Sequence, residues 1–221
     1  MTRPATWPRA STSPSRSNDE PESQFQSGGT LNPQLTIPPL PRPLRAAVVG
    51  VTGSGKTTLA HRLAGQLHIP HVELDALHWG PHWTPRPAEV FSALAAEALS
   101  GEAWVTDGNY GKVRPIVWRS ANALLWLDYS LPVCLWRLTK RLCRRVFQGE
   151  ELWNGNRETL GDHFFSRDSL YLWALQTHGR YRRQYAAEVL RPEYAHLKVL
   201  RFKTPRAAEA WLAELDSEAP G

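Results

Sequence analysis

Short apolar runs alternate with amphipathic stretches along most of this 221-residue chain. Continuous apolar runs bounded by polar residues are typical of buried strands, and apolar residues repeated every three or four positions are typical of helices. The pattern predicts five strands, at residues 46–49, 71–74, 104–106, 123–127 and 198–202. It predicts helices after residue 56, at 87–99, at 132–147, at 169–190 and after Thr204-Pro205. Because strands and helices alternate, we expect a three-layer α/β/α sandwich around a five-stranded parallel sheet.

The first 43 residues differ from the rest, since they are rich in proline and serine and have no apolar periodicity. Such a segment buries too little apolar surface to offset the entropy lost on ordering. We therefore predict a disordered tail at residues 1–43 and one domain at 44–221. No apolar run approaches the ~20 residues of a membrane span, and no apolar core of a signal peptide is visible. We expect a cytoplasmic protein without a membrane partner, either a monomer or a homodimer.

The net charge of +5 is mild, but the basic residues are clustered. One cluster lies at residues 137–145, and Arg180, Arg182 and Arg183 form a second. Cys134 and Cys143 lie in one predicted helix and point in different directions, so we expect two free thiols.

The first predicted strand runs into Gly-Val-Thr-Gly-Ser-Gly-Lys-Thr-Thr at residues 50–58, which fits the P-loop pattern GxxxxGK[ST]. Glycines let backbone N–H groups approach phosphate oxygens closely, and the following helix presents its positive end there. In this pattern the lysine contacts the β- and γ-phosphates and the next hydroxyl binds magnesium. We therefore predict ATP and Mg²⁺ as cofactors; the alternative is a glycine-rich turn that binds nothing. The residues predicted to hold the nucleotide are Gly50, Thr52, Gly53, Ser54, Gly55, Lys56, Thr57 and Thr58.

Acidic residues follow three of the predicted strands, at the sheet edge where such folds bind ligands. Asp107 follows the third strand and can reach magnesium, usually through water, together with Thr57. Asp128 follows the fourth strand and is the rival for this role, but Gly108 leaves room for a ligand beside Asp107. Asp75 follows the second strand and is placed to accept a proton or a hydrogen bond from a substrate hydroxyl. The alternative for each acid is a role in capping a turn.

The predicted helix at 132–147 carries arginines on one face and leucines on the others. On a P-loop fold, arginines of a closing segment neutralise the transferred phosphoryl group. We therefore predict that Arg141 and Arg145 act in catalysis with Lys56 and Asp75. A basic face that is merely solvated would show the same pattern.

Three further segments are distinctive: Leu-Asp-Ala-Leu-His-Trp at 74–79, Trp-Val-Thr-Asp-Gly-Asn-Tyr at 104–110, and Trp-Asn-Gly-Asn-Arg-Glu at 153–158. With the P-loop, they resemble the adenylate-kinase-like proteins labelled topology modulation proteins, of the FlaR type, within the nucleoside monophosphate kinase group. The resemblance covers about residues 45–215. It implies a mobile lid at about 141–168 and matches Asp107 to the acid of the kinases' Asp-Gly-Phe-Pro-Arg motif.

The chain departs from adenylate kinases after Gly108, where Asn109-Tyr110 replaces Phe-Pro-Arg, and it lacks the segment that receives AMP. The acceptor therefore stays open. A polar and aromatic set near the second strand suits a ring or a hydroxylated molecule, although its tryptophans can equally be packing residues. Its two histidines alone do not indicate a metal site. The set consists of Asp75, His78, Trp79, His82 and Trp83.

Two functions fit these features. The first is an ATP-dependent phosphotransferase acting on a nucleotide or another small molecule. The second is a nucleotide-dependent regulatory or DNA-binding ATPase, in which Arg180, Arg182 and Arg183 contact phosphate backbones. The sequence contains no recognised DNA-reading motif, which favours the kinase.

Overall fold

The computed structural model describes residues 40–148 and 170–217. The chain divides into two compact units, residues 1–39 and residues 40–221, and only the second contains described residues. The predicted tail lies outside the described residues except for positions 40–43, so its disorder stays a prediction. Within the described residues, no helix is long and apolar enough to cross a membrane.

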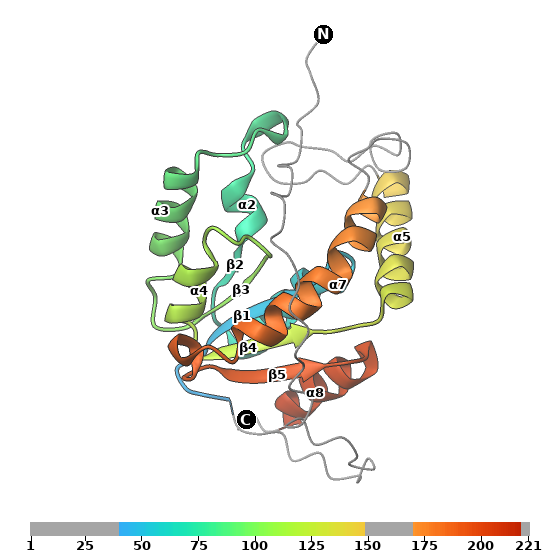
Figure 1. Ribbon diagram of the computed structural model, residues 1–221. Coiled ribbons are helices and arrows are strands. Elements are labelled where there is room, and N and C mark those ends of the chain that lie inside the picture. Colours follow the sequence, from blue (N-terminus) through green and yellow to red (C-terminus); the bar gives the residue numbers. More distant parts are fainter. Residues whose placement is uncertain (1–39, 149–169, 218–221) are drawn as a thin grey trace, which may run out of the picture. The chain divides into compact units, whose positions relative to one another are not determined.

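A five-stranded parallel sheet forms the middle layer, with the strand order β2-β3-β1-β4-β5 (Figure 1). The strands are β1 (Arg45–Gly50), β2 (His71–Glu73), β3 (Trp104–Asp107), β4 (Ala123–Leu127) and β5 (Lys198–Phe202). β3 and β4, which flank the central β1, are buried from end to end. The five predicted strands are confirmed, with two changes: Leu74 begins a helix, and Asp107 is the last residue of β3 rather than the residue after it.

Helices cover both faces of this sheet. α3, α4 and α7 pack with one face in a shared apolar cluster, whereas α1 and α8 contact the sheet and each other on the opposite side. The helices are α1 (Lys56–Leu67), α2 (Leu74–His78), α3 (Ala88–Ala98), α4 (Arg114–Ser120), α5 (Leu131–Gln148), α7 (Leu170–Glu188) and α8 (Pro205–Ser217), with 3-10 turns η1 (Pro81–Trp83) and η3 (Pro192–Tyr194). The predicted three-layer α/β/α architecture is therefore confirmed.

The predicted long helices end within two residues of the observed ones, but two short helices were not predicted. α2 has five residues and α4 has seven, too few for a repeat of three or four positions to appear twice on one face. The C-terminal helix begins as its sequence predicts, because the Thr204 hydroxyl accepts a hydrogen bond from the Ala207 N–H at 3.2 Å.

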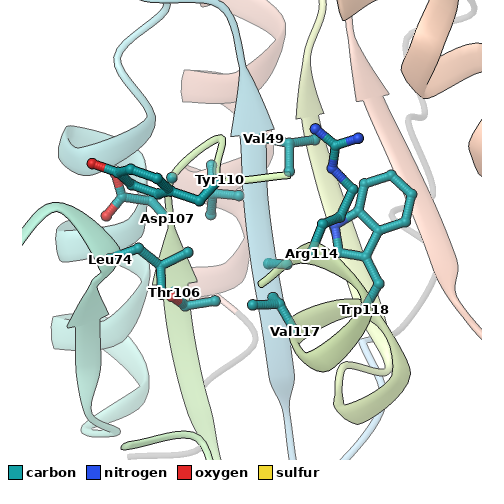
Figure 2. Close-up of a pocket in the computed structure, with 11 residues that line it drawn as sticks. Val49, Leu74, Thr106, Asp107, Tyr110, Arg114, Val117 and Trp118 are labelled. Carbon is teal, nitrogen blue, oxygen red and sulfur yellow. The ribbon is translucent and has the colours of Figure 1, made fainter. Parts of the chain in front are cut away.

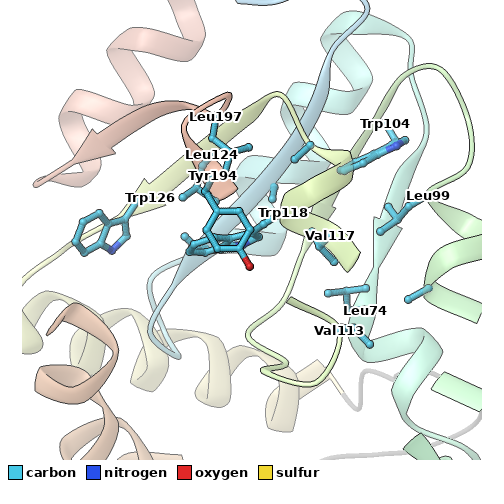
Figure 3. Close-up of a cluster of buried hydrophobic side chains, with 14 of the residues drawn as sticks. Leu74, Leu99, Trp104, Val113, Val117, Trp118, Leu124, Trp126, Tyr194 and Leu197 are labelled. Atoms are coloured by element: carbon cyan, nitrogen blue, oxygen red, sulfur yellow. The ribbon is translucent and has the colours of Figure 1, made fainter. Parts of the chain in front are cut away.

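A large apolar cluster joins the sheet to α3, α4 and α7 (Figure 3). Trp118 of α4 is fully buried there, with its ring 5.9 Å from that of Tyr185 and 5.1 Å from that of Tyr194. Burying one large aromatic side chain stabilises the fold by about 1.5–3 kcal/mol. The cluster thus fixes α4 and α7 against the strands and holds the loops at the carboxyl edge of the sheet.

All five strands point the same way, so their carboxyl ends meet at one edge. The register pairs Asp107 with Val48 of β1 and with Glu73 of β2, and it pairs Gly50 with Leu127. The loop after β1 therefore lies between the ends of β3 and β4, beside Asp107.

Candidate functional site

Residues 50–55 form a tight loop between β1 and α1. Gly53 and Gly55 adopt φ values of 77° and 89°, in the left-handed region that glycine favours. Gly55 directly precedes α1, and no described side chain caps this helix. The first N–H groups of α1 therefore stay available at the loop, which is the arrangement that binds phosphate at helix N-termini.

The predicted nucleotide-binding residues lie together around this loop. Thr52 lies in the loop, and buried Ser54 donates its backbone N–H to the Val51 carbonyl at 3.1 Å. Thr57 and Thr58 follow Lys56 in the first turn of α1, with their side chains exposed. Their binding of a nucleotide stays a prediction.

Helix α5 packs directly on the loop. A Cβ on Gly53 would lie 2.3 Å from the carbonyl oxygen of Cys134, and a Cβ on Gly55 would lie 2.5 Å from Nη2 of Arg137. Gly53 therefore requires glycine for space as well as for backbone conformation, whereas at Gly55 the Arg137 side chain can move aside and the positive φ is what favours glycine. The Arg137 guanidinium lies against the N-terminus of α1, although the sequence pattern gave this residue no separate role within the basic face.

Lys56 is the first residue of α1, and its side chain turns back onto the loop. Its Nζ donates to the Val51 carbonyl oxygen at 3.2 Å. Burial lowers the pKa of Lys56, while the charges of Asp107 and Asp75 oppose this and Arg141 adds to it. The structure thus brings four of the predicted site residues within electrostatic reach of one another.

Asp107 is buried at the end of β3 and accepts hydrogen bonds on both carboxylate oxygens. The Thr57 hydroxyl donates to Oδ2 at 2.7 Å, and Nε2 of His71 lies 2.9 Å from Oδ1. The Thr57 contact places Asp107 beside the loop, as its proposed role requires. His71 was not predicted as a site residue, because a histidine that opens a short strand carries no motif.

Asp128, the rival acid, has different partners. Arg201 donates to its Oδ2 through Nη2 at 2.6 Å, and Nε of Arg182 lies 3.2 Å from its Oδ1. The Arg201 guanidinium also lies 4.2 Å from the ring centre of Trp126. Asp128 therefore ties α7 and β5 to the end of β4, whereas Asp107 is the acid that contacts Thr57.

Asp75 lies in α2, where the Tyr110 hydroxyl donates to its Oδ1 at 2.5 Å. Burial raises the pKa of Asp75; the hydrogen bond from Tyr110 opposes the rise, Asp107 adds to it, and Lys56 and Arg141 oppose it. Burial, followed by the charge of Asp75, likewise raises the pKa of Tyr110. Figure 2 shows Tyr110 and Asp107 on the same side of the crevice that they line.

The remaining aromatic residues near Asp75 pack against one another. The His78 ring lies 4.5 Å from that of Tyr110 and 4.6 Å from that of Trp79, which is buried. Burial, with a smaller effect of Lys112, lowers the pKa of His78, which favours the neutral ring. The packing alternative thus describes Trp79, and His78 packs beside it. His82 is exposed and Trp83 half-buried in a turn where both have positive φ, 55° and 53°.

The predicted catalytic arginines fall at the far end of α5. Arg141 acts on the pKa of both Lys56 and Asp75, which places it at the site. The Arg145 side chain lies outside the described residues. Of the predicted lid, residues 141–148 are the last turns of α5 and residues 149–168 lie outside the described residues.

Tyr185 of α7 contacts the loop that follows β3, and Asn109 of that loop contacts the last residue of β1. The Tyr185 hydroxyl donates to Oδ1 of Asn109 at 2.8 Å, and Asn109 Nδ2 donates to the Gly50 carbonyl. Arg114, at the other side of the crevice in Figure 2, pairs with Glu188 through Nη1 at 3.0 and 2.8 Å. Asn109 was noted in the sequence only as a departure from a motif, and its contacts show that it joins three segments.

The donor set fits a magnesium ion. A hydroxyl and a carboxylate oxygen are the hard ligands that Mg²⁺ prefers, and Mg²⁺ bound with phosphates needs only one or two protein ligands. Thr57 and Asp107 supply this pair. The described residues contain no cluster of three or more histidine, cysteine or acidic side chains that could hold a metal by themselves. Cys134 is buried and Cys143 exposed, and both are free thiols as predicted.

The basic cluster of α7 is partly engaged within the molecule. Arg182 pairs with Asp128. Arg180 lies over the rings of Trp173 and Tyr181 at 5.9 and 5.4 Å. Asp128 thus offsets the charge of Arg182, whereas Arg180 keeps its charge.

No protein-family model and no curated protein matches the sequence. Among solved structures, the chain is similar to a gluconokinase from Sinorhizobium meliloti 1021, with 22% sequence identity over 79% of this chain and 94% of that chain and a TM-score of 0.44. It is similar to a shikimate kinase from Bacteroides thetaiotaomicron, with 16% identity over 79% and 97% and a TM-score of 0.48. A sugar kinase from Janibacter sp. HTCC2649 shares 23% identity over 80% and 98%, with a TM-score of 0.42.

At these identities and TM-scores the likenesses concern the fold alone, and they do not confirm the resemblance to topology modulation proteins. The chain is an α/β protein whose five-stranded parallel sheet lies between two layers of helices, the fold class that the hydrophobic pattern predicts.

Proposed function

We propose that this protein is an ATP-dependent phosphotransferase that acts on a small molecule or a nucleotide. The observation that carries the proposal is the 2.7 Å contact between the Thr57 hydroxyl and Asp107, directly after the glycine loop and Lys56. It joins a P-loop hydroxyl to a strand-terminal carboxylate, the two groups that hold magnesium in P-loop enzymes. In this role the loop amides and Lys56 bind the triphosphate, and Thr57 and Asp107 hold Mg²⁺, which supplies charge neutralisation at the phosphates.

Asp75 is the acceptor-side residue of this proposal. Its raised pKa brings the carboxyl closer to the range in which a general base works near neutral pH. The acceptor oxygen forms a bond to the γ-phosphorus, the bond from that phosphorus to the β,γ-bridging oxygen breaks, and ADP leaves with the electron pair. The proton of the acceptor hydroxyl passes to Asp75.

Positive charge for the transferred phosphoryl group comes from α5. The charge of Arg141 affects the pKa of Lys56, which is on the ATP side of the proposed reaction, and the pKa of Asp75, which is on the acceptor side. Arg137 lies against Gly55, where the phosphates would meet the N-terminus of α1. Arg145 is proposed for the same role from the sequence pattern alone. Arginines in such positions stabilise the charge that spreads over the phosphoryl oxygens.

A panel of acceptors tests this function. Purified protein is incubated with Mg-ATP and nucleotides, nucleosides or sugar acids, and transfer of phosphate to the acceptor is measured by mass spectrometry. Lys56→Ala is expected to abolish transfer with the fold intact, since it removes the charge on the β- and γ-phosphates. Lys198→Ala is the matched control, because Lys198 begins β5 at the opposite edge of the sheet.

Steady ATP hydrolysis that no acceptor changes would contradict the phosphotransferase. A salt-sensitive DNA complex that tightens with ATP would instead support the regulatory alternative.

A further inference from the structure

His71 is the first residue of β2, the strand that pairs with β3. Its backbone pairs with Val105, yet its side chain reaches the carboxylate two residues farther along β3. The side chains of His71 and Asp107 are only 10% and 4% exposed. The His71 ring also lies 6.0 Å from the ring of His61 on α1, so it is held between the first helix and Asp107.

Each oxygen of the Asp107 carboxylate contacts a different residue. A carboxylate only accepts hydrogen bonds, so Nε2 of His71 carries the proton shared with Oδ1, just as the Thr57 hydroxyl donates to Oδ2. Because Thr57 donates its proton to Asp107, the lone pairs of its oxygen are free to face a cation. The orientation of the carboxylate therefore decides which way the Thr57 hydroxyl points.

We propose that His71 is a positioning residue for Asp107, whose Nε2–H fixes the carboxylate so that Asp107 and Thr57 together bind the magnesium ion of Mg-ATP. The proposal rests on the proposed function only in so far as the loop binds Mg-ATP. Residues that hold a metal-side group through a hydrogen bond typically change metal affinity by about 10–100-fold when they are removed. His71 would act in this way without touching the nucleotide.

Nucleotide binding with and without the metal separates this role from a merely structural one. Affinity for a fluorescent ATP analogue is measured across a Mg²⁺ titration and again in EDTA. For His71→Leu we expect the Mg²⁺ concentration at half-saturation to rise about 10-fold or more, with affinity in EDTA unchanged. His71→Gln keeps an N–H donor near the position of Nε2 and should restore the wild-type Mg²⁺ dependence.

Two controls sharpen the result. His61→Leu removes the ring beside His71 but leaves the donor, so its Mg²⁺ dependence should match the wild type. In an Asp107→Asn background, His71→Leu should have no further effect, because the group it positions is already changed. If the leucine variant does not fold, His71→Asn replaces it, since its shorter amide does not span the distance to Asp107.

The proposal is overturned if His71→Leu weakens binding equally in Mg²⁺ and in EDTA, if its Mg²⁺ dependence equals that of the wild type, or if its effect persists beside Asp107→Asn. The readout needs no acceptor. A protein whose Mg²⁺-dependent ATP binding requires His71 but which phosphorylates nothing would contradict the proposed function and leave this inference standing.

Discussion

Replacing Tyr110 by phenylalanine removes one hydroxyl from the short contact with Asp75. A hydrogen bond to a charged group contributes about 1.5–3 kcal/mol, so the free energy of unfolding near pH 7 should fall by about that amount. The ring itself stays, and with it the contacts to His78 and Phe91. The hydroxyl also has a hydrogen bond with Trp79, so the part of the loss that depends on pH is the part that reports on Asp75.

The pH dependence of this loss follows from the pKa of Asp75. Burial raises that pKa in the folded protein, so the stability linked to proton binding is present below the ordinary carboxyl pKa and is lost as pH rises through the folded pKa. The Tyr110 hydroxyl opposes the rise, and removing it raises the folded pKa further. The variant should therefore lose more stability at pH 7 than at low pH, where Asp75 is protonated in both proteins.

Urea unfolding at several pH values, followed by tryptophan fluorescence, measures this difference. Tyr171→Phe is the matched control, because its hydroxyl donates to the neutral Thr139 hydroxyl at 2.9 Å. That variant should lose about 0.5–1.5 kcal/mol with little dependence on pH. A Tyr110→Phe loss that is absent, or that is the same at pH 4 and pH 7, would refute the reasoning.

Two other substitutions test contacts around the site. Arg114→Met should lower the free energy of unfolding by about 3 kcal/mol, the low end for a buried pair, because the largely buried Glu188 carboxylate then keeps only its hydrogen bond from Gln184. Adding Glu188→Leu should restore most of this loss in chemical denaturation, whereas Arg119→Met, at an exposed pair, should cost less than about 1 kcal/mol. Arg137→Ala should weaken binding of a fluorescent ATP analogue by about 10-fold or more, the equivalent of 1.4 kcal/mol. Arg144→Ala, an exposed arginine on the same helix, should not, and equal affinities for both variants would contradict a role for Arg137 at the loop.

The strands and the loop could be predicted because their signals are local. An apolar run ending in Gly50 or Asp107 marks a buried strand and its carboxyl end within a few residues. The preference for Asp107 over Asp128 as the magnesium-side acid was based on the neighbouring Gly108. In the structure Asp107 contacts Thr57, whereas Asp128 is paired with two arginines.

The partners of these acids could not be predicted, because each contact joins residues far apart in the chain. His71 reaches Asp107 across 36 positions and Tyr110 reaches Asp75 across 35. Which strand neighbours which, and therefore which side chains face the same carboxylate, is a property of the sheet order rather than of any short segment. The contact of Arg137 with the P-loop could not be predicted for a related reason, since four arginines on one helix face look alike until the loop is placed against one of them.

Four side chains of α7 contact other elements along the length of the helix. His178 reaches the carbonyl of Tyr129, Arg182 reaches Asp128, Tyr185 reaches Asn109, and Glu188 reaches Arg114. Four anchors over three turns of helix fix its rotation and its register against the carboxyl edge of the sheet. A substitution that removes any one of these contacts therefore leaves three others to hold α7 at the carboxyl edge of the sheet.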